Sequence, residues 1–238
     1  MIRAERPKVH ALTNFVAMSF SANLLLAAGA VPSMTFRADA IADFVASTRS
    51  LVVNLGMLDA EREAAIRRAV PLARELGRRW VLDPVKVERS GERRRFALDL
   101  LAAGPTVLRA NTSEITALAG EGEGPAALRL ARRFGCVVAQ TGPEDLVTDG
   151  ARSFEIANGS PLMDRVTAMG CAGSALMGAF LAVEPDALVA AASTLLVLSV
   201  AGDVAAERAA GPGSFQPALL DAVYNLDEVT LVERARGR

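Results

Sequence analysis

The residues best suited to chemistry lie in a glycine-rich stretch at residues 163–180, where a short polar loop leads into a helix of small side chains. The first turn of a helix exposes unpaired N–H groups and the positive end of the helix dipole, so this junction can bind an anion. Ala168, Met169 and Gly170 form the loop, and Cys171 lies where the helix begins. That position lowers the pKa of a thiol and makes it usable as a base. The alternative is a buried packing helix with an inert cysteine, because free cysteines are commonly buried.

A second group of reactive side chains follows a series of apolar runs. These runs predict buried strands at residues 51–54, 80–84, 106–109 and 136–140. Helical patterns alternate with them, which predicts an α/β fold with a mostly parallel sheet and helices on both faces. In such sheets, ligands bind beyond the carboxyl ends of the strands. The residues found there are Asn54, Gly56, Asp83, Pro84, Arg109, Asn111, Glu114, Thr141 and Gly142.

These strand-end residues include the parts of a magnesium–nucleotide site. Asp83 and Glu114 supply carboxylates for a cation, and Arg109 supplies positive charge for phosphate. Each also has a structural explanation, since Asp83 could cap a turn and Asn111 could cap the helix that carries Glu114. The presence of several such residues at one edge of the sheet favours the nucleotide site.

Further helices are expected at residues 16–28, 38–47, 59–76, 112–119, 128–135, 171–183, 186–210 and 214–226. A short strand is expected at residues 30–35, and residues 9–14 form a short segment that ends in two capping residue types. Two polar strands, at 145–148 and 152–156, are predicted to pair through an Asp-Gly turn. Residues 234–238 are expected to form a loose basic end.

Composition narrows the class of protein. The chain has 238 residues, of which 51% are hydrophobic and only 5% aromatic, so one large domain over residues 1–238 with an Ala-, Val- and Leu-rich core is expected. The formal charge of −1 favours neither nucleic acid nor an anionic membrane as a partner. His10 is the only histidine, which excludes a Cys/His zinc site. The opening residues contain no apolar run and the cysteines number two, so we expect a cytoplasmic protein. The apolar stretch at 187–202 is interpreted as a buried core helix rather than a membrane span.

Nine short motifs, in order along the chain, resemble the hydroxyethylthiazole kinase family, whose fold is ribokinase-like. They lie at residues 9–14, 52–58, 82–85, 108–114, 140–142, 147–150, 158–163, 169–172 and 206–216. The Arg-x-Asn-x-x-Glu motif at 109–114 and the Gly-Pro-Gly-Ser-Phe motif at 211–215 are specific to that family, whereas Thr-Gly alone is weak. The resemblance covers nearly the whole chain, from His10 to about Leu226.

The resemblance implies transfer of the γ-phosphoryl group of ATP to the hydroxyl of 4-methyl-5-(2-hydroxyethyl)thiazole in the thiamine pathway. It implies that Arg109 and Thr141 contact ATP and that Asp83 and Glu114 hold Mg²⁺. It also implies that Cys171 is the general base, at a position where relatives of this fold usually have Asp.

The resemblance further implies that Met34, Asn14 and Ala168 contribute to the substrate pocket, with Met169 and Gly170 in the anion loop. The family is trimeric with substrate sites between subunits, so a homotrimer is implied here. No nucleic-acid or membrane partner follows from it.

Two stretches depart from the family pattern. In the first, residues 86–90 replace a small glycine-bearing loop, and Lys86 and Arg89 there either add charge near the phosphates or form a solvated run. The solvated interpretation is favoured because long basic side chains are mostly exposed. In the second, Ala168 and Met169 replace Gly and Thr, and Ala168 should disfavour positive φ, so the loop is expected to be held differently. Two alternatives stay open: a ribokinase-like kinase for another small hydroxymethyl compound, and a weakly active or non-catalytic binding relative.

Overall fold

A single sheet runs through the computed structural model, which describes residues 1–237. Within these residues the sheet has eight strands in the order β2-β1-β3-β4-β5-β6-β7-β8. The strands are β1 (Lys8–Leu12), β2 (Val31–Ser33), β3 (Ser50–Asn54), β4 (Arg79–Asp83), β5 (Val107–Asn111), β6 (Val137–Thr141), β7 (Asp145–Thr148) and β8 (Ser153–Ile156). The pairs from β2 to β6 are parallel, while β7 and β8 are antiparallel additions at one edge. The predicted mostly parallel sheet and the polar hairpin are therefore confirmed.

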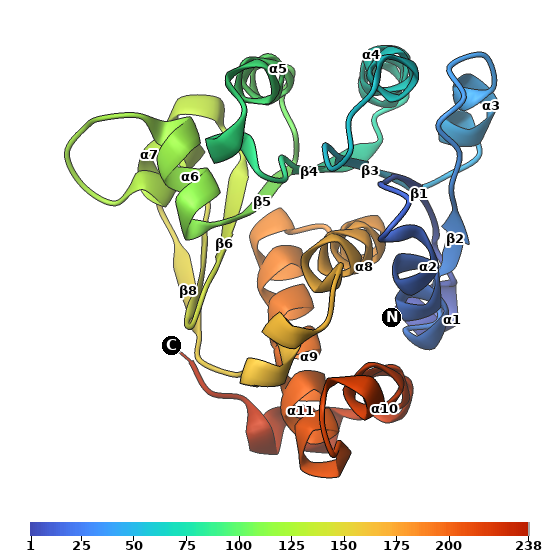
Figure 1. Cartoon of the computed structure of the whole chain (residues 1–238), viewed down its shortest axis with the longest axis vertical. Helices are drawn as coiled ribbons and strands as arrows, with labels where there is room; N and C mark the ends of the chain where they lie inside the picture. Colours follow the sequence, from blue (N-terminus) through green and yellow to red (C-terminus); the bar gives the residue numbers. More distant parts are fainter. Residues whose placement is uncertain (238) are drawn as a thin grey trace.

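Helices cover both faces of the sheet (Figure 1). The helices are α1 (Ile2–Glu5), α2 (Met18–Ala27), α3 (Ile41–Ala46), α4 (Ala60–Glu75), α5 (Gly91–Ala102), α6 (Thr112–Ala119), α7 (Ala126–Phe134), α8 (Met169–Val183), α9 (Ala187–Arg208), α10 (Pro212–Asn225) and α11 (Glu228–Arg234), with short 3₁₀ turns η1 (Val87–Arg89) and η2 (Pro161–Arg165). Helices α3 to α7 lie on one face, α8 and α9 lie on the other, and α10 and α11 form a further layer beyond α9 (Figure 1).

Alternation along the central strands explains why two layers form. On β3, Leu51 and Val53 belong to the core under α3 to α7, whereas Val52 belongs to the core under α8 and α9. Successive side chains of a strand point to opposite faces, so an apolar run buried on both faces is what a covered parallel sheet requires. Asn54, two residues beyond Val52, therefore lies on the α8 side.

Helix α9 is the one helix of the described chain that is long and apolar enough to cross a membrane by length and composition. Over half of its most apolar window, 56%, is nevertheless buried inside the protein. It lies between the sheet and α10, and its buried apolar residues, which include Leu188, Leu195, Leu198 and Ala205, belong to two adjoining cores. This arrangement agrees with its interpretation as a core helix.

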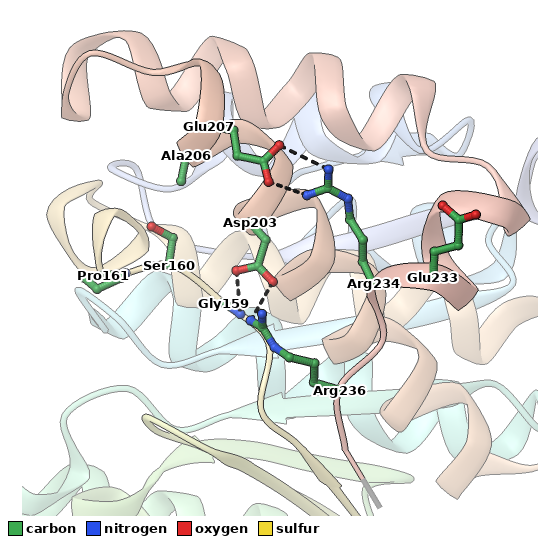
Figure 2. Close-up of a pocket in the computed structure, with 9 residues that line it drawn as sticks. All are labelled: Gly159, Ser160, Pro161, Asp203, Ala206, Glu207, Glu233, Arg234 and Arg236. Carbon is green, nitrogen blue, oxygen red and sulfur yellow. Dashed lines mark hydrogen bonds and ion pairs between the residues drawn. The ribbon is translucent and has the colours of Figure 1, made fainter.

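Besides the short helix α1 and the turns η1 and η2, which are not predicted, three elements differ from the sequence-based prediction. Strand β1 lies inside the sheet, between β2 and β3, although no strand is predicted at residues 9–14. Helix α5 occupies a stretch without a predicted helix, because three consecutive arginines obscure the spacing of its buried residues. The expected loose end at 234–238 is wrong for the described part of the chain. Arg234 ends α11 and pairs with Glu207 (2.5 Å), and Arg236 pairs with Asp203 (3.0 Å) beside a pocket of about 490 Å³ (Figure 2). Arg238 lies outside the described residues.

Candidate active site

Strand register brings the predicted site residues onto one face of the sheet. Asn54, Asp83, Arg109 and Thr141 each follow by two positions an apolar residue of the core under α8 and α9. Those apolar residues are Val52, Val81, Val107 and Ala139. Because β3 to β6 are parallel, all four polar side chains emerge at the same carboxyl edge. The chain also changes direction there, since β1 is followed by β2 on one side and β3 on the other, and ligands bind at such switch points.

Hydrogen bonds connect this edge with the first turns of α8. Asn54 Nδ2 and Ser174 Oγ both donate to Asp83 Oδ2, each at 2.8 Å. Asn14 Nδ2 donates to Asn54 Oδ1 at 3.1 Å and also lies 3.5 Å from Cys171 Sγ, which it can use as an acceptor. One chain of side-chain contacts thus runs from the carboxylate of Asp83 to the thiol of Cys171.

Burial is the main influence on the pKa of the Asp83 carboxyl and of the Cys171 thiol. It raises the pKa of Asp83, while the nearby Arg109 charge and the hydrogen bonds from Ser174 and Asn54 oppose the rise. It also raises the pKa of Cys171 to about 11, and the negative charge of Asp83 adds to the rise. Cys171 does lie at the helix start, as the third residue of α8, but the expected lowering of its pKa is wrong. Burial and the neighbouring carboxylate outweigh the helix dipole.

The N-terminal turn of α8 lies open beside Arg109. Ala168 is the N-cap, and no side chain of the described residues caps the turn. A Cβ added at Gly170 would lie 2.6 Å from Arg109 Nη1, so glycine is needed for the guanidinium to lie against the turn. The Nε atom of Arg109 is buried without a hydrogen-bond partner within residues 1–237. Helix N–H groups and an arginine guanidinium side by side are the donors from which proteins build anion sites.

In the loop before α8, Ala168 has a positive φ, which the sequence-based prediction expected it to avoid. Its backbone has φ 64° and ψ 8°, the left-handed conformation that glycine adopts easily. Alanine therefore accepts the positive φ that it was expected to avoid. Met169 is the first residue of α8 and is half-buried, packed with Ala168 against the core shared by α8, α9 and α10.

Glu114 has a structural role as well as a position in the site. Asn111 Oδ1 accepts from the Glu114 backbone N–H, and Glu114 Oε2 accepts from the Asn111 N–H, both at 2.9 Å, which completes a capping box at α6. Glu114 Oε1 also accepts from the Lys86 N–H at 2.8 Å. Burial raises the pKa of Glu114, these backbone bonds lower it, and the charge of Asp83 raises it further. The capping explanation therefore holds for Asn111, and the two carboxylates interact.

Within residues 1–237, no group of three or more His, Cys, Asp or Glu side chains could hold a metal ion. Two buried carboxylates, of which Asp83 raises the pKa of Glu114, nevertheless suit a divalent cation. Mg²⁺ commonly binds one or two carboxylates and completes its shell with substrate phosphates and water. Asp83 and Glu114 fit that pattern, in which the nucleotide brings the remaining ligands.

The loop at residues 86–90, which differs from the family pattern, exposes its two basic side chains to solvent. Val87 is buried and anchors η1, whereas Lys86 and Arg89 are exposed, with the Arg89 side chain 81% accessible. Lys86 has φ 60°, and its backbone N–H is the group held by Glu114. The solvated interpretation of these two side chains agrees with the structure.

His10 positions the segment that carries Met34. Its Nδ1 lies 3.0 Å from Ser33 Oγ and its Nε2 lies 3.2 Å from the Thr35 carbonyl oxygen. A carbonyl only accepts, so Nε2 carries the proton and Nδ1 accepts from the Ser33 hydroxyl. Burial lowers the pKa of His10 to about 4, so the ring stays neutral. Met34, held between these two contacts, lies at the carboxyl end of β2, beside the strand that leads to Asn14.

Three residues of the site lack an assigned role in the sequence-based prediction. Ser174 lies one turn after Cys171 and could have been found from that spacing. Asp145 accepts from the Gly142 N–H at 3.0 Å and shapes the loop after Thr141, which its position three residues after Gly142 could have suggested. Arg62 is buried next to Asn54 and has no such signal, since a charge on an amphipathic helix is usually solvated.

The profile of the hydroxyethylthiazole kinase family matches residues 1–229 of this chain. The chain belongs to the hydroxyethylthiazole kinase family. A hydroxyethylthiazole kinase of Granulibacter bethesdensis is 48% identical, covering 99% of this chain and 91% of the relative. A hydroxyethylthiazole kinase of Cereibacter sphaeroides is 45% identical, covering 99% and 95% respectively.

Solved structures agree with membership of the hydroxyethylthiazole kinase family. The structure of the Pyrococcus horikoshii OT3 hydroxyethylthiazole kinase protein superposes with a TM-score of 0.96 at 39% identity, covering 100% of this chain and 95% of that one. The pyridoxal kinase of Staphylococcus aureus superposes with a TM-score of 0.66 at 17% identity, covering 82% of this chain and 88% of that chain, which shows a shared fold alone. The predicted family and ribokinase-like fold are confirmed.

Proposed function

We propose that this chain transfers the γ-phosphoryl group of ATP to the hydroxyl of 4-methyl-5-(2-hydroxyethyl)thiazole, as a kinase of the thiamine pathway. The observation that carries the proposal is the uncapped N-terminal turn of α8 beside Arg109, whose buried Nε has no hydrogen-bond partner within residues 1–237. Membership of the hydroxyethylthiazole kinase family supplies the thiazole alcohol as acceptor. The whole chain would act as one kinase domain.

Phosphoryl transfer requires little covalent chemistry from the protein, so positioning and charge stabilisation carry the catalysis. The N–H groups around Met169 and Gly170 and the Arg109 guanidinium would hold the transferred group. Thr141, the last residue of β6, would contact the nucleotide just before the loop that Asp145 shapes. The backbone N–H donors are held in place by α8 before the ligand binds, and donors that are oriented in advance stabilise the charge of the transition state.

Asp83 and Glu114 would hold Mg²⁺ together with the phosphates, and the ion would neutralise charge that develops on them. Both carboxylates are already oriented, Asp83 by Asn54 and Ser174 and Glu114 by two backbone N–H groups.

Cys171 would take the proton of the acceptor hydroxyl. Because the transition state of phosphoryl transfer is loose, this proton leaves late, and a base contributes modestly. The thiol is mostly protonated at neutral pH, since its pKa is raised to about 11. The turnover number should therefore increase with pH across the neutral and mildly alkaline range, and a turnover number that is flat there would contradict a thiolate base.

Met34, Asn14 and Ala168 would line the thiazole pocket, and a second copy of the chain would complete it in a homotrimer. Large apolar side chains surround this edge of the sheet: Phe15, Val16 and Met57 are 51%, 56% and 53% exposed. Phe15 and Val16 directly follow Asn14, and Met57 follows Gly56. Sedimentation equilibrium should give a trimer, and a monomer at micromolar concentration would remove the shared pocket.

A coupled ADP-release assay with a panel of small primary alcohols tests the proposal. We expect magnesium-dependent ADP release that is fastest with the thiazole alcohol. Faster release with another hydroxymethyl compound would assign a different acceptor, and no release with any alcohol would favour a binding protein without turnover. The reaction uses ATP and a small metabolite, so we place it in the cytoplasm, with no nucleic-acid or membrane partner.

A further inference from the structure

Arg62 is a buried cation, and both its burial and its position at a helix N-terminus disfavour its positive charge. Its side chain belongs to α4 and is 1% exposed, with no carboxylate within ion-pair distance among residues 1–237. It also lies in the first turn of α4, where the helix dipole disfavours positive charge. Asp59, the N-cap of this helix, offsets part of the cost by its nearby charge.

Within residues 1–237, the Arg62 guanidinium donates only to backbone carbonyls of one turn, and its buried Nε has no partner. Nη1 donates to the carbonyl oxygens of Gly56 and Met57, the latter at 2.7 Å, and Nη2 donates to the Asn54 carbonyl at 3.0 Å. Three donors thus hold the turn between β3 and α4. The turn is irregular, since Met57 has φ 50°, a conformation that persists only where surrounding contacts hold it.

This turn carries the centre of the active-site network. Asn54 Oδ1 accepts from the Gly56 N–H at 3.0 Å and from Asn14, while Asn54 Nδ2 donates to Asp83. A Cβ at Gly56 would lie 2.7 Å from Asn14 Nδ2, so the turn packs directly against that amide. A shift of the turn therefore moves Asn14 and Asn54 together, and with them the environments of Cys171 and Asp83.

We propose that Arg62 is a positioning residue for phosphoryl transfer, which acts by holding the turn at residues 54–57 and, through Asn54 and Asn14, sets the geometry of Asp83 and Cys171. This role rests on the proposed kinase activity. It is separate from the direct phosphate donors, because Arg109 and Gly170 approach the site from β5 and α8.

The test compares Arg62→Ala, Arg62→Lys and the control Arg68→Ala, which makes the same change at an exposed position of the same helix. The turnover number, the KM for ATP, the melting temperature and the hydrogen exchange of the turn are measured for each. For Arg62→Ala we expect turnover per folded molecule to fall at least about tenfold while the KM for ATP stays within about twofold. Exchange of the Gly56 amide should become faster, and added methylguanidinium should restore both turnover and protection.

Arg62→Lys offers fewer donors in a different geometry and should fall between the native protein and Arg62→Ala. It also serves as the folded variant if Arg62→Ala does not fold. Unchanged turnover in a variant whose turn exchanges faster would overturn the proposal, as would a full-activity Arg62→Lys whose turn exchanges as fast as that of Arg62→Ala. A native protein without alcohol-dependent ADP release would instead refute the proposed function, and the exchange data would still report whether Arg62 holds the turn.

Discussion

Two helices begin at the same edge of the sheet, and their N-termini are built in opposite ways. At α6, Asn111 and Glu114 satisfy each other's backbone N–H groups in a complete capping box. At α8, Ala168 occupies the N-cap in a left-handed conformation, and no described side chain caps the turn. The first end is satisfied by the fold, and the second is left available to a ligand.

An open helix end alone does not define a site. Helix α7 also begins without a side-chain cap within the described residues, but the nearby Arg129 guanidinium already donates to the carbonyls of Gly120, Gly122 and Gly124. What distinguishes α8 is the Arg109 guanidinium against Gly170, together with Cys171 in the same turn and with Asp83, which Ser174 contacts one turn further on. Changes at α8 should therefore affect activity more than stability, and changes at α6 should affect stability directly.

The largest effect is expected from Asp83→Asn. Removing the carboxylate should lower turnover by about 10³-fold, a loss of ~4 kcal/mol of stabilisation of the kind a bound cation provides. The fold should not suffer, because an amide oxygen can still accept from Asn54 and Ser174. Steady-state kinetics together with thermal unfolding measures both quantities, and unaltered turnover at limiting magnesium would contradict the assignment.

The same variant has a pH signature. The folded-state pKa of Asp83 is raised above the ordinary carboxyl value, so folding favours its protonated form. Its contribution to stability is greatest below the ordinary pKa and is lost as pH rises through the raised one. The free energy of unfolding of the native protein, minus that of Asp83→Asn, should therefore decrease with pH over that window. Denaturant titrations at several pH values check the sign, and a difference that increases would show that the pKa is lowered instead.

Gly170→Ala should have the next largest effect. The new Cβ would displace the Arg109 guanidinium from the turn, and loss of one donor to developing charge typically costs about 10²-fold in rate. Gly91→Ala is the matched control, since its Cβ would lie 3.9 Å from its nearest neighbour, Arg95 Nη1. Equal turnover of the two variants would show that Arg109 has no role at this turn.

At α6 the effect should appear in stability. Asn111→Ala removes the N-cap and should lower the free energy of unfolding by ~1 kcal/mol, while folded molecules keep most of their activity. Glu114→Gln should also destabilise, since one of its two acceptors becomes a donor facing a backbone N–H. Denaturant unfolding followed by far-UV circular dichroism measures both changes. A melting temperature unaffected by Glu114→Gln would contradict the structural role of this residue.

The smallest effect is expected from Ala168→Gly. Relief of the left-handed conformation gains ~1–2 kcal/mol, and the added freedom of glycine in the unfolded chain costs ~0.4–1 kcal/mol. A net stabilisation of about 0.5–1 kcal/mol should result, with turnover nearly unchanged. Destabilisation would mean that Ala168 gains more from its packing than it loses in backbone strain.

Much of this arrangement can be predicted from the sequence. Buried strands stop at Asn54, Asp83 and Thr141, and the parallel sheet implied by alternating helices brings strand ends to one edge. What pattern reasoning could not provide was the balance of competing effects. The pKa of Cys171 is raised rather than lowered, because burial and Asp83 together exceed the helix dipole, and sequence spacing gives no measure of burial.

Strand β1 and the roles of Arg62 and Glu114 could not be predicted from the sequence, each for a different reason. Strand β1 was missed because His10 interrupts its apolar pattern. In the sequence His10 counts as a polar residue, whereas in the structure it is a buried neutral ring with two hydrogen-bond partners. Arg62 resembles any solvated helix charge until its three carbonyl partners are seen. Glu114 was expected to serve a metal ion only, whereas the structure also gives it three backbone-linked contacts around α6. A local sequence pattern does not show which distant residues a single polar side chain will contact in the folded protein.

Isothermal titration of ATP and of adenosine into the native protein and Gly170→Ala tests the central claim most directly, namely that the open end of α8 with Arg109 is the phosphate site. ATP carries the phosphates that this turn should hold, and adenosine does not. The account predicts that the native protein binds ATP at least about tenfold more tightly than adenosine, and that Gly170→Ala loses most of this preference while its affinity for adenosine is kept. An equal preference for ATP in both proteins would show that the phosphates bind elsewhere and would contradict the account.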